Sequence, residues 1–213
     1  MKKLIIISIL ALLTGQIFGQ DTLSGGYTSL AEFKSGKIKF PDTFTVEERT
    51  HGDIKAWGGN DYKIESSDEH ITKSIIRQQI WGVYKDGTLY LNGIPITGLI
   101  WYAEVEIFGK YSFLHPAFPI NKKIQKELGL NDPQYGYMFG AIGGAIQGAN
   151  MAFKRIPLIY NIETGEKMLL CESNVSKILN NYPELKSEYD KENTKTNENV
   201  MLKYLIKVND LEK

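Results

Sequence analysis

Two glutamates, Glu104 and Glu106, stand two residues apart in the segment GLIWYAEVEIFGKYSFLHP. Alternate side chains of a β-strand share one face, so these two carboxylates would lie about 7 Å apart. Carboxylates at about that separation can act as the acid and the base in glycoside hydrolysis. A strand that carries charge on its solvent-facing side explains the same pattern. The sequence therefore leaves two interpretations, a catalytic pair and an ordinary charged strand face.

A second candidate site surrounds Trp57, which is followed by Gly58-Gly59-Asn60-Asp61. Adjacent glycines supply the positive φ angles of tight hairpins, so DIKAWGGNDYKI predicts two short strands around a turn. Asn60 and Asp61 beside Trp57 would present either a ligand-binding turn or a structural hairpin. The 3 tryptophans and 12 tyrosines suit a carbohydrate-stacking surface, and they equally suit the core of a sheet.

The remaining reactive residue types form no recognisable constellation. His51, His70 and His115 are not at metal-ligand spacing from one another. The single cysteine, Cys171, follows Met-Leu-Leu and is interpreted as a buried, unreactive side chain. No phosphate-binding loop, zinc-protease motif or nucleophile elbow is present. We expect neither a metal nor a cofactor.

The charge balance argues against one class of partner. The chain has 25 basic and 25 acidic residues, so its formal net charge is zero. Nucleic-acid binding depends on a basic field that neutralises phosphates. We therefore expect no nucleic-acid partner.

Residues 1–19 have the layout of a secretory signal peptide. Met-Lys-Lys precedes the apolar run LIIISILALL, and smaller, more polar residues follow up to Gly19. The apolar run is too short to cross a bilayer comfortably, although a retained anchor is the alternative. We expect cleavage after Gly19 and export to the periplasm, the outer membrane or the extracellular space.

The segment GYMFGAIGGAIQGANMAF, residues 136–153, repeats a glycine every fourth position. In a helix, Gly136, Gly140, Gly144 and Gly148 would form one continuous ridge that lets another backbone approach closely. Four interior glycines cost about 4 kcal/mol of helix propensity, so packing must offset that cost. The packing partner would be a sheet or helix of this protein, a second copy or another protein such as an envelope component, or a bilayer.

The other segments indicate the secondary structure that would carry these residues. IWGVYKDGTLYLNG predicts a hairpin around Asp86-Gly87, and RIPLIYNIETGEKMLLC predicts another around Gly165. SSDEHITKSIIRQQI fits a helix or a strand. Residues 172–213 contain amphipathic stretches that predict a helical C-terminal tail.

Together these elements predict an α+β protein. An antiparallel sheet would span roughly residues 40–120 and 155–170, with the glycine-ridged helix 136–153 packed on it. The expected organisation is a signal peptide over 1–19, an α+β domain over 20–171 and a helical tail over 172–213.

Several segments in this order resemble a family of secreted proteins of unknown function from Bacteroidetes-type Gram-negative bacteria. They are GGYTSLAEFKSGK, DIKAWGGNDYKI, IWGVYKDGTLYLNG and ILNNYPELKSEYDKE with YLIKVND. The resemblance implies export and supplies no activity, cofactor or catalytic residue. Our leading hypothesis is an exported protein that acts by binding rather than catalysis. The alternatives are a hydrolase of envelope polymers that uses Glu104 and Glu106, and a protein that associates with the membrane through residues 136–153.

Overall fold

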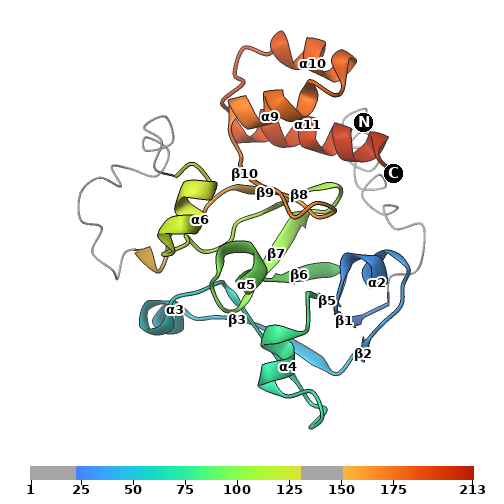
Figure 1. The fold of residues 1–213 in the computed structure, drawn as a ribbon, viewed down its shortest axis with the longest axis vertical. Helices are drawn as coiled ribbons and strands as arrows, with labels where there is room; N and C mark the ends of the chain where they lie inside the picture. The colour runs from blue at the N-terminus through green and yellow to red at the C-terminus, as the bar shows by residue number, and fades with distance from the viewer. Residues whose placement is uncertain (1–22, 131–150) are drawn as a thin grey trace, which may run out of the picture.

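The computed structural model describes residues 23–130 and 151–213, and it confirms the predicted α+β class (Figure 1). Every strand pairing is antiparallel. The strands are β1 (Gly25–Tyr27), β2 (Phe40–Pro41), β3 (Phe44–Glu48), β4 (Tyr62–Ser66), β5 (Gly82–Lys85), β6 (Thr88–Asn92), β7 (Tyr102–Ile107), β8 (Tyr111–Leu114), β9 (Leu158–Asn161) and β10 (Lys167–Leu169). The helices are α2 (Leu30–Lys34), α3 (His51–Trp57), α4 (Lys73–Gln78), α5 (Gly93–Thr97), α6 (Lys122–Glu127), α9 (Glu172–Leu179), α10 (Pro183–Asp190) and α11 (Glu198–Leu211).

The sheet is mostly a meander in which strands adjacent in the chain are adjacent in space. Its order is β10-β9-β8-β7-β6-β5-β1-β2, and the β3–β4 hairpin joins β7 through the pair Tyr62↔Tyr102. Strand β7 therefore pairs with β4 near its start, with β6, and with β8 near its end. The loop before β7 and the start of β4 are brought together by this arrangement.

The hairpins predicted around Asp86-Gly87 and around Gly165 are confirmed. Asp86 and Gly87 connect β5 to β6 with φ angles of 50° and 84°, the positive values that Asp-Gly turns favour. Strands β9 and β10 form the second hairpin. The segment that contains Glu104 and Glu106 is two strands, β7 and β8, connected through Gly109.

The prediction of a strand before Gly58 was wrong, because residues 51–57 form helix α3. Thr50 begins the helix with a capping box in which its hydroxyl accepts from the N–H of Asp53, and the Asp53 side chain accepts from the N–H of Thr50. Both bonds satisfy backbone donors that a helix start leaves open. The ambiguous segment also resolves as a helix, α4, which Thr72 caps.

Helices α9, α10 and α11 form a layer on one face of β8–β10, at the top of Figure 1. Phe113, Ile159 and Met168 stand in register on neighbouring strands and pack against these helices. Each of these residues has a leucine beside it in the sequence that points to the opposite face of the sheet. These leucines, Leu114, Leu158 and Leu169, belong to a second core. Apolar side chains thus cover both faces of this half of the sheet. 

One asparagine joins the last helix to the sheet. The side chain of Asn209 in α11 accepts from the N–H of Tyr111 at 2.9 Å and donates to the Tyr111 carbonyl at 3.0 Å. Gly109 lies against this amide so closely that a Cβ there would stand 2.2 Å from the Asn209 Cγ. The absence of a side chain at Gly109 therefore makes room for this contact.

Candidate functional site

A cavity of about 50 Å³ lies where β4, α4, the start of α5 and the start of β7 meet. Its volume is enough for about three or four water molecules. We call it the Trp101 cavity, and its described lining residues are Lys63, Ile64, Glu65, Lys73, Ile76, Arg77, Asn92, Ile94, Trp101 and Tyr102.

The backbone of Trp101 is held in a conformation that non-glycine residues rarely adopt. Its φ is 75°, and such a backbone costs about 1–3 kcal/mol unless its surroundings enforce it. The Asn60 Nδ2 donates to the carbonyls of Trp101 and Ile100 at 3.2 and 3.3 Å, and the Gly93 N–H donates to the Trp101 carbonyl at 3.0 Å. A Cβ on Gly59 would lie 2.7 Å from Cδ1 of the indole. The bonds to its carbonyl and the close approach of Gly59 therefore restrict the position of Trp101.

A buried arginine stacks on the indole of Trp101. The Arg49 Cζ lies 4.9 Å from the ring centroid, a separation typical of cation–π contacts. The guanidinium donates to the carbonyls of Gly58 and Asn60 at 2.7 Å each and of Asp53 at 3.1 Å. Burial lowers the pKa of Arg49, yet arginine stays charged in proteins. Arg49 thereby ties the end of α3 to the Trp101 side chain.

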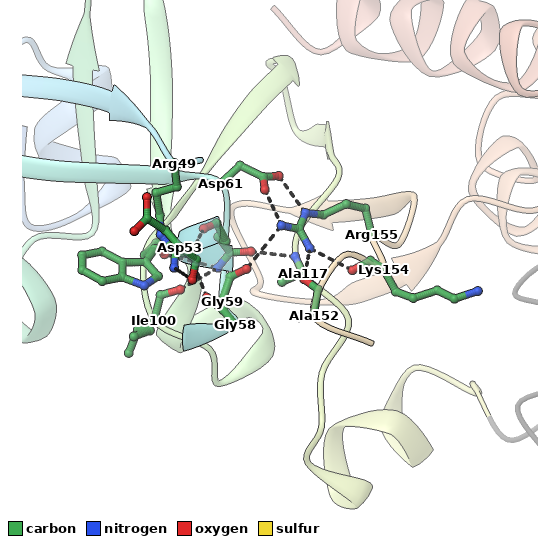
Figure 2. Close-up of polar contacts among 12 residues, drawn as sticks. Arg49, Asp53, Gly58, Gly59, Asp61, Ile100, Ala117, Ala152, Lys154 and Arg155 are labelled. Carbon is green, nitrogen blue, oxygen red and sulfur yellow. Dashed lines mark hydrogen bonds and ion pairs between the residues drawn. The ribbon is translucent and has the colours of Figure 1, made fainter. Parts of the chain in front are cut away.

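A second arginine fixes the start of β4 from the other side, as Figure 2 shows. The Arg155 Nε donates to Asp61 Oδ2 at 2.7 Å, and its Nη2 pairs with Asp61 Oδ1. The Arg155 Nη1 also donates to the carbonyls of Ala152 and Lys154 at 3.0 Å each. A bidentate pair of this kind has a defined geometry. These contacts position the residues next to Asn60 and hence the wall of the cavity.

The opening of the Trp101 cavity is predominantly cationic. Lys63, Lys73 and Arg77 line it together with one carboxylate, Glu65. Lys63 and Glu65 pair at 3.0 Å; this bond raises the pKa of Lys63 and lowers that of Glu65. Neither Lys73 nor Arg77 forms an ion pair within residues 23–130 and 151–213. Two cations at the cavity therefore form no ion pair in the described part of the chain, although the charge of Lys73 also helps to lower the pKa of Glu65.

Trp57, Asn60 and Asp61, the three residues of the predicted ligand-binding turn, lie in different environments. Trp57 ends α3 and is 76% exposed. Asn60 is fully buried, and its Oδ1 accepts from the Ala117 N–H at 2.7 Å. Asp61 is paired with Arg155. Asn60 and Asp61 thus have internal partners and position the Trp101 cavity, while Trp57 does not line it.

Glu104 and Glu106 have different partners, Tyr62 on β4 and His115 just after β8. The Tyr62 hydroxyl donates to Glu104 Oε2 at 2.6 Å, and burial together with this bond raises the pKa of Tyr62. Glu106 pairs with His115 Nδ1 at 2.5 Å. Their use as a catalytic pair stays a hypothesis.

The remaining sequence candidates divide between described and undescribed residues. Cys171 is buried, in agreement with its interpretation as an apolar side chain. The ridge glycines, Gly136, Gly140, Gly144 and Gly148, lie outside the described residues. Within the described ranges, no group of three or more His, Cys, Asp or Glu side chains could hold a metal ion. Across those same residues, no helix is both long enough and apolar enough to span a membrane.

The sequence analysis missed Trp101 and Arg77 as site residues. Trp101 was considered only as one of the three tryptophans that suit a carbohydrate-stacking surface or a sheet core, and it lies just before β7. Lys73 and Arg77, four residues apart, do show a sequence signal, because that spacing places both on one face of a helix. This spacing could not be used as evidence for a site, because the same segment fitted a strand equally well.

The fold and the cavity define an α+β protein with a small cavity lined by three cationic side chains and one carboxylate among its described residues. A family model described as a family of unknown function (DUF6563) matches residues 25–212, so the chain belongs to this family. Comparison with curated proteins and comparison with solved structures each found no match. 

Proposed function

We propose that this protein is exported and acts by binding a small ligand, or the end group of a larger envelope component, in the Trp101 cavity. The observation that carries the proposal is the convergence on Trp101 of a strained backbone, a stacked buried arginine and a cavity. Strained backbone conformations concentrate at functional sites. The Trp101 indole N–H is also buried without an acceptor among the described residues.

The lining of the cavity favours binding over catalysis. None of its described lining residues is a serine, cysteine, histidine or aspartate. Its one carboxylate, Glu65, has a lowered pKa because of its bond to Lys63, so it is poorly suited to donate a proton near neutral pH. The raised pKa of Lys63 likewise disfavours the neutral amine that a nucleophile needs.

The binding proposal predicts a specific nuclear magnetic resonance result. The indole N–H groups of Trp57, Trp81 and Trp101 give separate signals that can be assigned with Trp57→Phe and Trp81→Phe. In a titration with neutral, anionic and cationic fragments, we expect at least one fragment to shift the Trp101 signal and leave that of exposed Trp57 unchanged. Ile94→Phe, at the cavity, should abolish the shift.

The matched control is Ile120→Phe, because Ile120 is also exposed and does not line the cavity. That variant should retain the Trp101 shift. If no fragment of any class moves the Trp101 signal, or if both variants behave alike, the cavity is not a binding site.

Export predicts a processed chain in a Gram-negative host. The layout of residues 1–19 supports this part of the proposal. We expect the mature N-terminus to be Gln20 and the protein to be released by an alkaline carbonate wash of the envelope fraction. If the protein instead stays in the washed pellet, and if Gly144→Leu releases it, residues 136–153 pack in or against the membrane. An intact N-terminus in the cytoplasm would contradict export.

A further inference from the structure

Arg77 is arranged as an anion-binding group. Its Cζ lies 5.4 Å from the centroid of the Trp101 ring, which places the guanidinium plane within range of the aromatic ring. Its side chain forms no ion pair with the described residues. Stacking restrains a guanidinium while its N–H edges stay available, and those edges match the geometry of a carboxylate or a phosphate. A restrained arginine loses less conformational freedom when it binds such a group.

Lys73 extends this feature along α4. It precedes Arg77 by four residues, one helical turn, and both residues line the cavity. Lys73 helps to lower the pKa of Glu65 through its charge, but Glu65 already pairs with Lys63, which also pairs with Glu47. Lys73 and Arg77, which form no ion pair with the described residues, therefore leave a positive potential at the opening.

The walls and the volume restrict what can enter. Ile64, Ile76, Ile94 and the Trp101 and Tyr102 rings supply apolar surface behind the cations. A cavity of about 50 Å³ admits a group of only a few heavy atoms. The occupant is therefore an end group, with the rest of its molecule outside.

We infer that the Trp101 cavity binds an oxyanion, a carboxylate or a phosphate, carried on a short apolar stem. This inference rests on the proposed function, because it names the chemical class that the cavity selects. Arg77 binds the oxyanion through its N–H edges, Lys73 and Lys63 contribute charge, and the apolar stem packs against the isoleucines and the indole.

Four probes with the same four-carbon stem test the class of ligand. They are butyrate, monobutyl phosphate, the neutral butyramide and the cationic butylammonium, each titrated against the Trp101 indole signal. We expect butyrate or monobutyl phosphate to bind at least about tenfold more tightly than butyramide, and butylammonium not to bind. Comparison of the two anions identifies which oxyanion the cavity prefers.

Arg77→Gln is the decisive variant, because Arg77 is exposed and its replacement should leave the fold intact. It should weaken anion binding about tenfold or more, and Arg77→Lys should restore part of the loss. Lys55→Gln, an exposed cation on α3 that does not line the cavity, should change nothing.

The two proposals fail in different ways. If the fragment library yields ligands at Trp101 but butyramide or butylammonium binds as well as butyrate, the oxyanion inference is wrong and the binding function stands. Anion binding that Arg77→Gln leaves unchanged also overturns the inference. If no fragment of any class binds, the proposed function itself fails.

Discussion

Replacing Asn60 with alanine is expected to lower the free energy of unfolding by about 3 kcal/mol. The substitution removes three side-chain hydrogen bonds, to the carbonyls of Ile100 and Trp101 and from the N–H of Ala117. The two carbonyls keep a bond from a backbone N–H each, but the Ala117 N–H loses the acceptor that Asn60 provides. An unsatisfied buried donor is the largest part of the cost.

Thermal unfolding followed by circular dichroism measures this effect. For a chain of this size, about 3 kcal/mol corresponds to a fall in Tm of roughly 6–12 °C. Asn181→Ala is the control, since Asn181 is exposed, and it should change stability by less than about 0.5 kcal/mol. Equal effects of the two variants would show that the Asn60 network is not important for stability.

Gly109→Ala and Asn209→Ala should each destabilise the protein by about 2–3 kcal/mol, and their effects should not add. A Cβ at Gly109 would lie 2.2–2.6 Å from the atoms of the Asn209 amide. Asn209→Ala leaves the Tyr111 N–H without its side-chain acceptor. Once that amide is absent, the three closest contacts of a Cβ at position 109 are removed, so the second substitution adds little.

A double-mutant cycle from urea unfolding measures the coupling. We expect the double variant to be more stable than the sum of the single variants predicts, by at least about 1 kcal/mol. Gly52→Ala in α3 is the control, because a Cβ there meets nothing closer than 3.6 Å and should be neutral or slightly stabilising. Strict additivity would mean that Asn209 moves away from the sheet without cost.

The sheet was largely predictable because its hairpins are specified locally. Asp86-Gly87 sets a turn whose geometry depends on those two residues alone. Helix α3 was missed because the sequence analysis gave weight to the glycine pair after Trp57 and overlooked the capping box of Thr50 and Asp53 before it. The capping box favours a helix and the glycine pair favours a hairpin. In the structure the segment forms the helix that the capping box begins.

The candidate site was much less predictable, because its parts are distant in the chain. The sequence analysis named Asn60 and Asp61 as candidates for a ligand-binding turn, and it gave no sign that Asn60 bonds to the backbone of Trp101. The positive φ of Trp101 arises from bonds that Asn60 and Gly93 make across the fold. No local pattern encodes such a backbone, so only the assembled strands reveal it.

The position of α11 has a consequence for synthesis of the chain. Strands β8, β9 and β10 precede α9, α10 and α11 in the sequence, so the strands are made before the helices that cover them. Until α11 is complete, Phe113, Ile159 and Met168 lack part of their apolar cover. A chain that terminates before residue 198 would expose this surface and be prone to aggregate. The last fourteen-residue helix is therefore expected to protect a newly made molecule from aggregation.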